Sequence, residues 1–183
     1  RWVEYHKWKV KAEWYTPLTQ SRGENPKSLV LRTSAGVGMI GQYNRRAGLS
    51  PFERFYLGGV FLSGFVLDGR EILNLRGYDD LSLTAPDRNT GAPVVAKYGA
   101  ELRYPLSTNP SATIYTLAFL EGGNTWEDPR AFNPFQVYRS AGVGLRIFLP
   151  MFGLLGLDYG WRLDEVESIP NMDRSQFHFS IGM

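Results

Sequence analysis

Three features are absent or weak in this sequence, and each excludes a class of protein. There is no cysteine, which excludes a disulfide framework and metal sites built from thiolates. No run of about 18 apolar residues occurs, which excludes a membrane-spanning helix. The 20 basic residues nearly balance the 18 acidic ones, so the net charge of +2 provides no strong field for binding nucleic acid.

What the sequence does contain favours strands and turns over helices. It has 20 glycines, and 14% of its residues are aromatic. Its 183 residues are enough for one ordinary core. The lack of a long apolar run does not exclude a membrane protein, because transmembrane strands alternate apolar and polar side chains and average to unremarkable hydropathy. Alternation along the chain is therefore the informative pattern.

Seven segments alternate with a period of two, each near the roughly 9 to 11 residues that a tilted strand needs to cross a bilayer. In the first of them, Lys9 and Lys11 share one face while Val10 and Trp14 share the other. The pattern predicts strands at residues 7–16, 28–41, 94–105, 112–123, 137–148, 154–161 and 176–183.

A soluble β-sandwich also alternates and is the alternative interpretation, but two observations favour a membrane barrel. The apolar faces carry aromatic residues near strand ends, as interfacial girdles do: Trp8, Trp14, Tyr98, Tyr104, Tyr159 and Trp161. The opposite faces carry charges in mid-strand and many glycines, which indicates that another backbone packs against that wall. These glycines are Gly36, Gly38, Gly99, Gly142, Gly144, Gly156, Gly160 and Gly182.

The connections also alternate between short and long. Residues 105–112 and 149–153 are short turns, whereas 42–91, 124–135 and 162–173 are longer. Short turns on one side and long loops on the other are typical of bacterial outer-membrane barrels. The connection 42–91 contains "FERFYLGGVFLSGFVL", which is too apolar to float in water. We expect this loop to fold into the lumen of the barrel.

Five blocks of sequence, in order, resemble the BamA-type outer-membrane β-barrel assembly proteins and their TamA and two-partner-secretion relatives. They are "SPFERFYLGG" with "LRGYDD", "AELRYPL", "AFLEGGNTW", "RSAGVGLRIFLPMFGLLGLDYG" and "QFHFSIGM". The second part of the first block resembles the signature of the family's inward-folded sixth extracellular loop: Leu75, Arg76, Gly77 and Tyr78. The resemblance covers nearly the whole chain.

The resemblance implies an all-β fold, a transmembrane antiparallel β-barrel of about sixteen strands. Residues 1–183 would be its C-terminal seven strands, with the long loop at about 42–91 in the lumen. The earlier strands and the periplasmic POTRA domains would precede Arg1. Because the family's last strand usually ends on an aromatic residue, Met183 is not expected to be the biological terminus.

A guanidinium in a partly dehydrated lumen needs carboxylate partners. Similar proteins pair the loop arginine with acidic residues on neighbouring strands, so we expect Arg76 to pair with Glu101 and Glu121, both on the inward face. Asp79 and Asp80 are local competitors for the same arginine. The plain alternative is that Arg76 is a solvated turn residue.

Catalysis is not expected, although some outer-membrane barrels are enzymes. His178 and Ser180 lie two residues apart on one strand face, which brings a base and a nucleophile together poorly. Glu101 and Glu121 could imitate a glycosidase pair, but pairing with Arg76 explains them better. No histidine cluster or carboxylate run indicates a metal, so neither a metal nor a cofactor is predicted.

The resemblance implies a central insertase that folds other β-barrel proteins into the outer membrane of a Gram-negative cell. Incoming strands would pair at a lateral seam beside the last strand, which carries Phe177, Phe179 and Ile181. Expected partners are unfolded outer-membrane proteins, assembly-complex lipoproteins, and lipid and lipopolysaccharide near Arg45 and Arg46, with no nucleic acid. The alternatives are a two-partner-secretion or TamA-like pore, and a soluble strand-rich binding module.

Overall fold

The computed structural model describes residues 4–19, 27–43, 49–50, 53–60, 70–109, 111–151, 153–166, 169 and 173–182. Parts of the long loop lie outside these residues, including Arg45, Arg46 and all of "FLSGFVL", and so does Met183.

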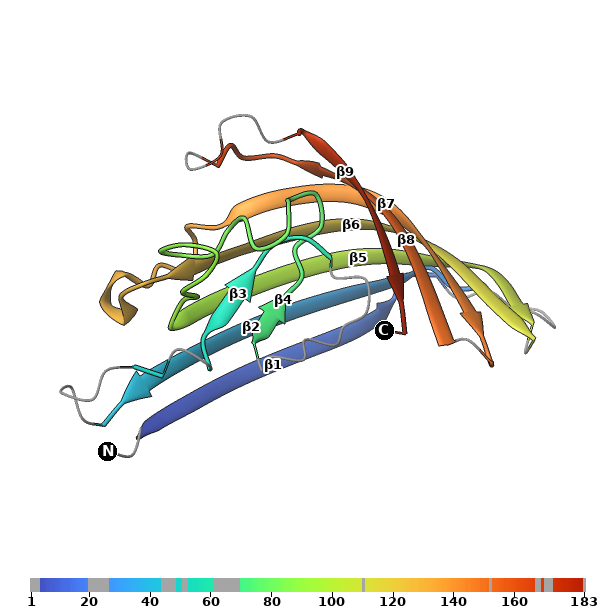
Figure 1. Ribbon diagram of the computed structural model, residues 1–183. Helices are drawn as coiled ribbons and strands as arrows, with labels where there is room; N and C mark the ends of the chain where they lie inside the picture. Colours follow the sequence, from blue (N-terminus) through green and yellow to red (C-terminus); the bar gives the residue numbers. More distant parts are fainter. Residues whose placement is uncertain are drawn as a thin grey trace.

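Seven long strands form one antiparallel sheet in the order β1-β2-β5-β6-β7-β8-β9 (Figure 1). Their bounds are β1 (Tyr5–Pro17), β2 (Val30–Gln42), β5 (Val94–Asn109), β6 (Ala112–Trp126), β7 (Tyr138–Leu149), β8 (Gly153–Arg162) and β9 (Ser175–Ile181). All neighbours in the sheet are consecutive in the chain except β2 and β5. Strands β1 and β9 are the two edges of the sheet, which is curved and open.

The expected all-β antiparallel fold is confirmed, because each alternating segment forms a strand at the expected place. The strand ends differ from the expected ones by a few residues. The largest difference is in β5, which continues past Pro105 to Asn109 through an irregularity between Pro105 and Ser107. A bulge of this kind absorbs the missing amide donor of a proline and lets the ladder resume beyond it.

The two faces of the sheet differ in the way that the alternation predicts. On the convex face, large apolar side chains such as Trp8, Leu120 and Val143 are exposed. On the concave face, the alternate positions are buried, including Phe119 between Ala118 and Leu120. A soluble sandwich would bury the apolar rows against a second sheet. Here they face outward, so the soluble-module interpretation is wrong.

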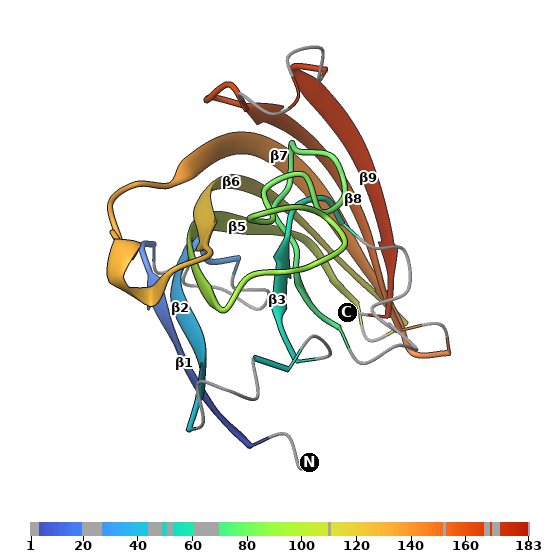
Figure 2. The ribbon, with the colours of Figure 1, turned by 60° about the vertical axis from the view of Figure 1, so that its left-hand side comes forward.

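The concave face is covered by the segment that connects β2 to β5. It contains two short strands, β3 (Phe55–Leu57) and β4 (Glu71–Leu73), which pair in parallel. Figure 2 shows the sheet curving around this segment, with β1 and β9 on opposite sides of it. A core cluster forms there from Leu57, Leu75, Tyr78, Leu83 and Val166. The loop therefore contributes most of this cluster, while two smaller clusters are built mainly from β2, β5 and β6.

The inward-facing glycines make room for what packs on the sheet, and at Gly160 this is the backbone of the loop. A Cβ at Gly160 would lie 2.7 Å from the backbone nitrogen of Gly77 in the loop. A Cβ at Gly142 would meet the ring of Phe119, and one at Gly144 would meet the carboxylate of Asp158. Gly182 lies just beyond β9, where its N–H donates to the carbonyl oxygen of Leu154 at 2.8 Å, but a Cβ there would meet no atom within 4 Å, so nothing packs against this glycine.

The connection between β6 and β7 contains a short 3-10 helix, η1 (Pro129–Ala131), capped by the Asp128 side chain, which accepts a hydrogen bond from the Arg130 N–H. Within the described ranges, the structure has no helix that is both long and apolar enough to span a membrane.

We predict that the convex face contacts lipid, with Leu120 at the middle of β6 and 54% exposed. Leu120→Lys in the full-length protein should lower the free energy of unfolding by about 2–4 kcal/mol in phospholipid vesicles, because a charge at mid-depth is desolvated. The matched control is Leu106→Lys near the end of β5, where the cost should be about 0–1 kcal/mol. Equal costs in urea titrations would contradict a lipid-facing wall.

Candidate functional site

The loop tip, residues 75–80, is held in place by hydrogen bonds within the loop itself. Leu75 donates its N–H to the carbonyl oxygen of Gly59 at 3.0 Å, and Leu83 donates to that of Leu57 at 3.1 Å. Gly77 has a φ of +85°, a conformation that L-residues with a Cβ seldom adopt. These bonds and the left-handed turn project Arg76 out of the loop toward the sheet.

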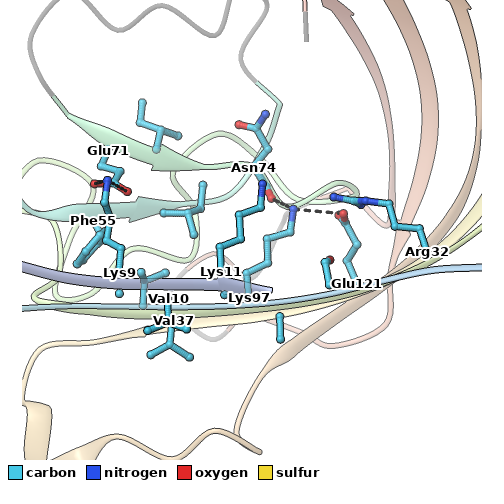
Figure 3. A pocket seen from close by; sticks show the side chains of 17 residues that line it. Lys9, Val10, Lys11, Arg32, Val37, Phe55, Glu71, Asn74, Lys97 and Glu121 are labelled. Atoms are coloured by element: carbon cyan, nitrogen blue, oxygen red, sulfur yellow. Dashed lines mark hydrogen bonds and ion pairs between the residues drawn. The ribbon is translucent and has the colours of Figure 1, made fainter. Parts of the chain in front are cut away.

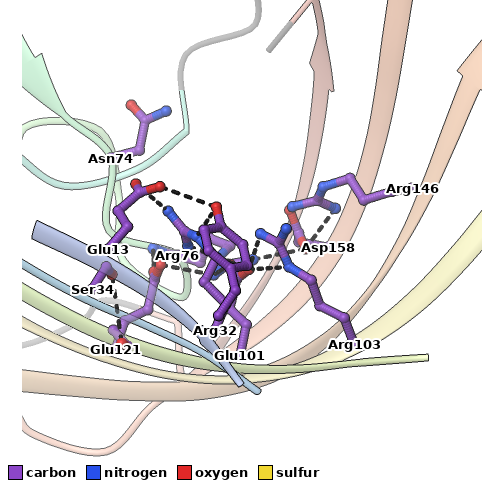
Figure 4. A network of polar contacts seen from close by, with 12 residues as sticks. Glu13, Arg32, Ser34, Asn74, Arg76, Glu101, Arg103, Glu121, Arg146 and Asp158 are labelled. Carbon is purple, nitrogen blue, oxygen red and sulfur yellow. Dashed lines mark hydrogen bonds and ion pairs between the residues drawn. The ribbon is translucent and has the colours of Figure 1, made fainter. Parts of the chain in front are cut away.

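The Arg76 side chain reaches three carboxylates from three strands (Figure 4). Its Nη2 lies 2.6 Å from Oε1 of Glu101 on β5 and 2.7 Å from Oε1 of Glu121 on β6. Its Nη1 lies 3.3 Å from Oδ1 of Asp158 on β8. Its backbone N–H also donates to Oε2 of Glu121 at 3.1 Å. Glu121 therefore binds both the side chain and the backbone of Arg76.

Strand register places an aromatic ring beneath the guanidinium of Arg76. Glu101 lies opposite Phe119, and Phe119 lies opposite Gly142, which has no side chain to block the ring. The Arg76 guanidinium stacks over that ring, with Cζ 3.7 Å from its centroid. Such stacking suits a planar, weakly hydrated cation. The acids thus surround the edge of the guanidinium while Phe119 covers a face.

Each of the three carboxylates also contacts a second cation on the wall. Arg103 hydrogen-bonds Glu101, Lys97 lies 3.2 Å from Glu121, and Arg146 binds Asp158 with two bonds of 3.0 and 2.8 Å. Burial alone would lower the pKa of Arg76, but the charges of Glu121, Asp158 and Glu101, with the Glu121 hydrogen bond, together outweigh it and raise the pKa above its ordinary value. Arg76 is therefore a permanent cation inside a connected network of charges.

The next two loop residues contact the wall as well. The Gly77 N–H donates to Nε2 of His178 on β9 at 2.9 Å. The Tyr78 hydroxyl donates to the carbonyl oxygen of Arg139 on β7 at 2.7 Å. Burial is the main reason that the pKa of Tyr78 is raised, so the phenol remains a donor. Leu75, the remaining residue of the predicted signature, is fully buried in the loop core.

The structure brings together Arg76, Glu101 and Glu121, the three residues for which the sequence predicted contact. Arg76 is 5% exposed, so the solvated-turn alternative is wrong. The expected competition is also absent in the described geometry, because Asp79 accepts a hydrogen bond from Gln176 and Asp80 lies beside Gly59.

Two residues that contact the loop tip, Asp158 and His178, were not predicted as its partners. Both alternate with the apolar residues of their strands, but nothing in the sequence gave their distance from the loop. They lie directly opposite each other in the β8–β9 register. The sequence feature that could have predicted these contacts is an acid on the inner face of one strand and a histidine on the inner face of the next.

A second contact region attaches the base of the loop to β1. Lys7 lies 3.1 Å from Glu53 and 2.7 Å from Glu71, and Lys9 lies 3.3 Å from Glu71. Lys97 donates to the carbonyl oxygen of Asn74 just before the loop tip. Between these contacts and the wall is a cavity of about 430 Å³, shown in Figure 3. The loop therefore does not fill the whole concave side.

The close approach of Gly77 to Gly160 predicts that Gly160→Ala displaces the loop tip, since the added Cβ would be 2.7 Å from a backbone nitrogen. We expect a loss of about 1–3 kcal/mol of stability and faster proteolysis within the loop. Gly36→Ala is the matched control on the same face, because its Cβ would have no neighbour nearer than 3.8 Å. Equal sensitivity of the two variants to protease would refute close packing at Gly160.

Arg76 and Glu121 should show strong energetic coupling in a double-mutant cycle with Arg76→Gln and Glu121→Gln. Either single change leaves the other charge buried without its partner, at about 3–5 kcal/mol, whereas the double change costs less than the sum. Neutral variants are preferable to charge exchange, because a glutamate at position 76 would face Glu101 and Asp158.

The control pair for this cycle is Arg139 and Asp164, whose nitrogen and oxygen are 2.7 Å apart but whose arginine side chain is 61% exposed. Its coupling should be below about 1 kcal/mol. Chemical unfolding of the full-length protein measures both cycles. If the coupling free energy of Arg76 and Glu121 is no larger than that of the exposed pair, burial does not strengthen this ion pair and the prediction is wrong.

Comparisons with known proteins agree with this architecture. A family model described as the Omp85 superfamily domain matches residues 1–183. The comparison with curated proteins gave no match. A crystal structure of BamA from Haemophilus ducreyi lacking POTRA domains 1–3 is similar, with a TM-score of 0.64 and 18% identity. The match covers 96% of this chain and 34% of that one, so the chain spans about a third of the solved protein's length.

At this identity the likeness to BamA shows a shared fold. That fold and the family together imply an outer-membrane β-barrel protein. Because the family model matches every residue from 1 to 183, the chain belongs to the Omp85 superfamily.

Proposed function

We propose that this chain is the C-terminal part of the barrel of a central outer-membrane insertase in a Gram-negative cell. In this proposal the protein folds and inserts other β-barrel proteins by pairing their strands with a lateral seam. The observation that carries the proposal is the loop tip anchored by Arg76 on the inner face of a strand wall whose whole sequence matches the Omp85 superfamily domain.

Strand β9 has the properties that strand addition requires. Its described residues pair with β8 over seven positions, and in this proposal its other edge forms the seam of the complete barrel. Unpaired edge groups are a template for another strand. Phe177 and Ile181 are exposed on the convex face, and Phe179 lies between them in the same alternation. An incoming strand could therefore extend both the hydrogen-bond ladder and the apolar outer surface.

The anchored loop supports the proposal from the inside. Its ion pairs and hydrogen bonds join the loop tip to β5, β6, β7, β8 and β9. The loop therefore stabilises the inner face of the sheet as far as β9. In this proposal no covalent chemistry and no cofactor takes part. His178 supports that view, because its Nε2 accepts the Gly77 N–H rather than facing a nucleophile.

The partners belong to the same proposal. Unfolded outer-membrane proteins would be the substrates, and assembly-complex lipoproteins would act with the domains that precede this part of the barrel. Outer-membrane lipid would contact the convex face, and lipopolysaccharide the long-loop end. The balanced charge of the chain supports the exclusion of nucleic acid.

The alternative is a two-partner-secretion or TamA-like pore. The cavity of about 430 Å³ between the loop and strands β1, β2 and β5 favours it, because an unfilled lumen offers space for a translocating segment. Depleting the full-length protein from its host separates the two functions. General loss of outer-membrane barrels supports the insertase, whereas loss of one exported protein supports the pore.

Strand templating makes a local prediction for crosslinking. A photoreactive residue in place of Phe177, which is 64% exposed on β9, should crosslink to a barrel substrate during its assembly by the full-length protein in vesicles. The control position is Val143 on β7, which is 50% exposed on the same convex face but lies two strands from the edge. Substrate adducts of equal yield at both positions would exclude pairing at the β9 edge.

A further inference from the structure

The inward face of β9 is attached to the loop tip by two hydrogen bonds. The Gly77 N–H donates to Nε2 of His178, and the Gln176 amide donates to the carboxylate of Asp79. Gln176 and His178 are two residues apart, so both side chains project to the same face of the strand. The loop tip therefore runs along β9 and holds it at consecutive inward positions.

This attachment adds to a short strand ladder. Strand β9 pairs with β8 over seven residues, whereas β5 pairs with β6 over fifteen. Its outward residues face away from the loop. On the concave side, the described hydrogen bonds that hold β9 are therefore those of the loop tip.

The contact at His178 requires one protonation state. A backbone N–H can only donate, so Nε2 of His178 must accept, which places the ring proton on Nδ1 of a neutral imidazole. An imidazolium donates from both nitrogens and cannot accept from Gly77. His178 is 7% exposed, so water does not readily replace the lost acceptor.

Charged groups from every side act on this imidazole. They are Asp158 on β8, Asp80 and Arg76 in the loop, and Glu121 on β6. A protonated ring would be attracted to the carboxylates, with Asp158 directly opposite it in register, and repelled by Arg76. Protonation therefore removes the acceptor for Gly77 and places a second positive charge near Arg76, which opposes the contact with the loop tip.

We propose that His178 is a proton-sensitive positioning residue that couples the loop tip to strand β9: the neutral ring holds the two together, and protonation releases them. Where it concerns the opening of the β9 edge, the inference rests on the proposed function. The coupling itself is a property of the folded protein and is measured without any assembly assay.

The test is hydrogen–deuterium exchange of the full-length protein in detergent at about pH 8 and about pH 5, the range over which histidine changes charge. Rates are corrected for the intrinsic dependence of exchange on pH. In the wild type, protection of residues 72–83 and of β9 should fall together at the lower pH, by roughly fivefold, the effect of losing one ordinary hydrogen bond.

Three variants separate coupling from a general effect of pH. His178→Gln keeps an acceptor oxygen that does not titrate, so its protection should be independent of pH in this range. His178→Ala should show low protection at both pH values, and His6→Gln, at the other histidine of the chain, should behave as the wild type. If His178→Ala fails to fold, the comparison of wild type with His178→Gln still decides.

The proposal is overturned if His178→Gln loses protection on acidification as the wild type does, or if the loop and β9 change at different pH. A failure of the insertase proposal has a different signature. It would appear in the depletion phenotype and in the crosslinks from Phe177, and would leave these exchange rates unchanged.

Discussion

The ion pair between Arg76 and its three carboxylates is the interaction on which the arrangement of this chain depends. A guanidinium buried to this extent is tolerated only when its charge and its hydrogen bonds are matched. Glu101, Glu121 and Asp158 supply that match from three strands, and Arg103, Lys97 and Arg146 compensate the acids in turn. The loop, the wall and the charge network are therefore mutually dependent, because none of the charged groups would be stable there alone.

The wall accepts this loop because of its small residues. Gly142 leaves space for the Phe119 ring beneath the guanidinium, and Gly160 allows the Gly77 backbone to touch the sheet. On the convex face, the same strands present large apolar side chains at the alternate positions. Each strand thus contributes to the lipid-facing surface and to the surface that binds the loop. Because successive side chains point to opposite faces, different residues serve the two surfaces.

The strands could be predicted because alternation is a local property, and all seven were found with small errors at their ends. The family was also confirmed, because several blocks occur in order along the chain. The parallel pairing of β3 with β4 was not predicted, since three-residue strands in an apolar segment have no readable period. The contacts of Asp158 and His178 with the loop were not predicted, because alternation along a strand indicates which face a side chain is on, whereas its distance from the loop depends on strand register and on the path of the loop.

The separation of β2 and β5 along the chain has a kinetic consequence. These neighbours pair over ten positions, yet residues 43–93 lie between them. Bringing the ends of such a segment together costs about 3.5 kcal/mol in chain entropy, beyond a constant. This high contact order makes their pairing a slow step compared with the hairpins that follow. If contacts inside the segment form first, such as those of Leu57 and Leu75, the loop that remains to be closed is shorter. The free-energy barrier to pairing β2 with β5 is then lower.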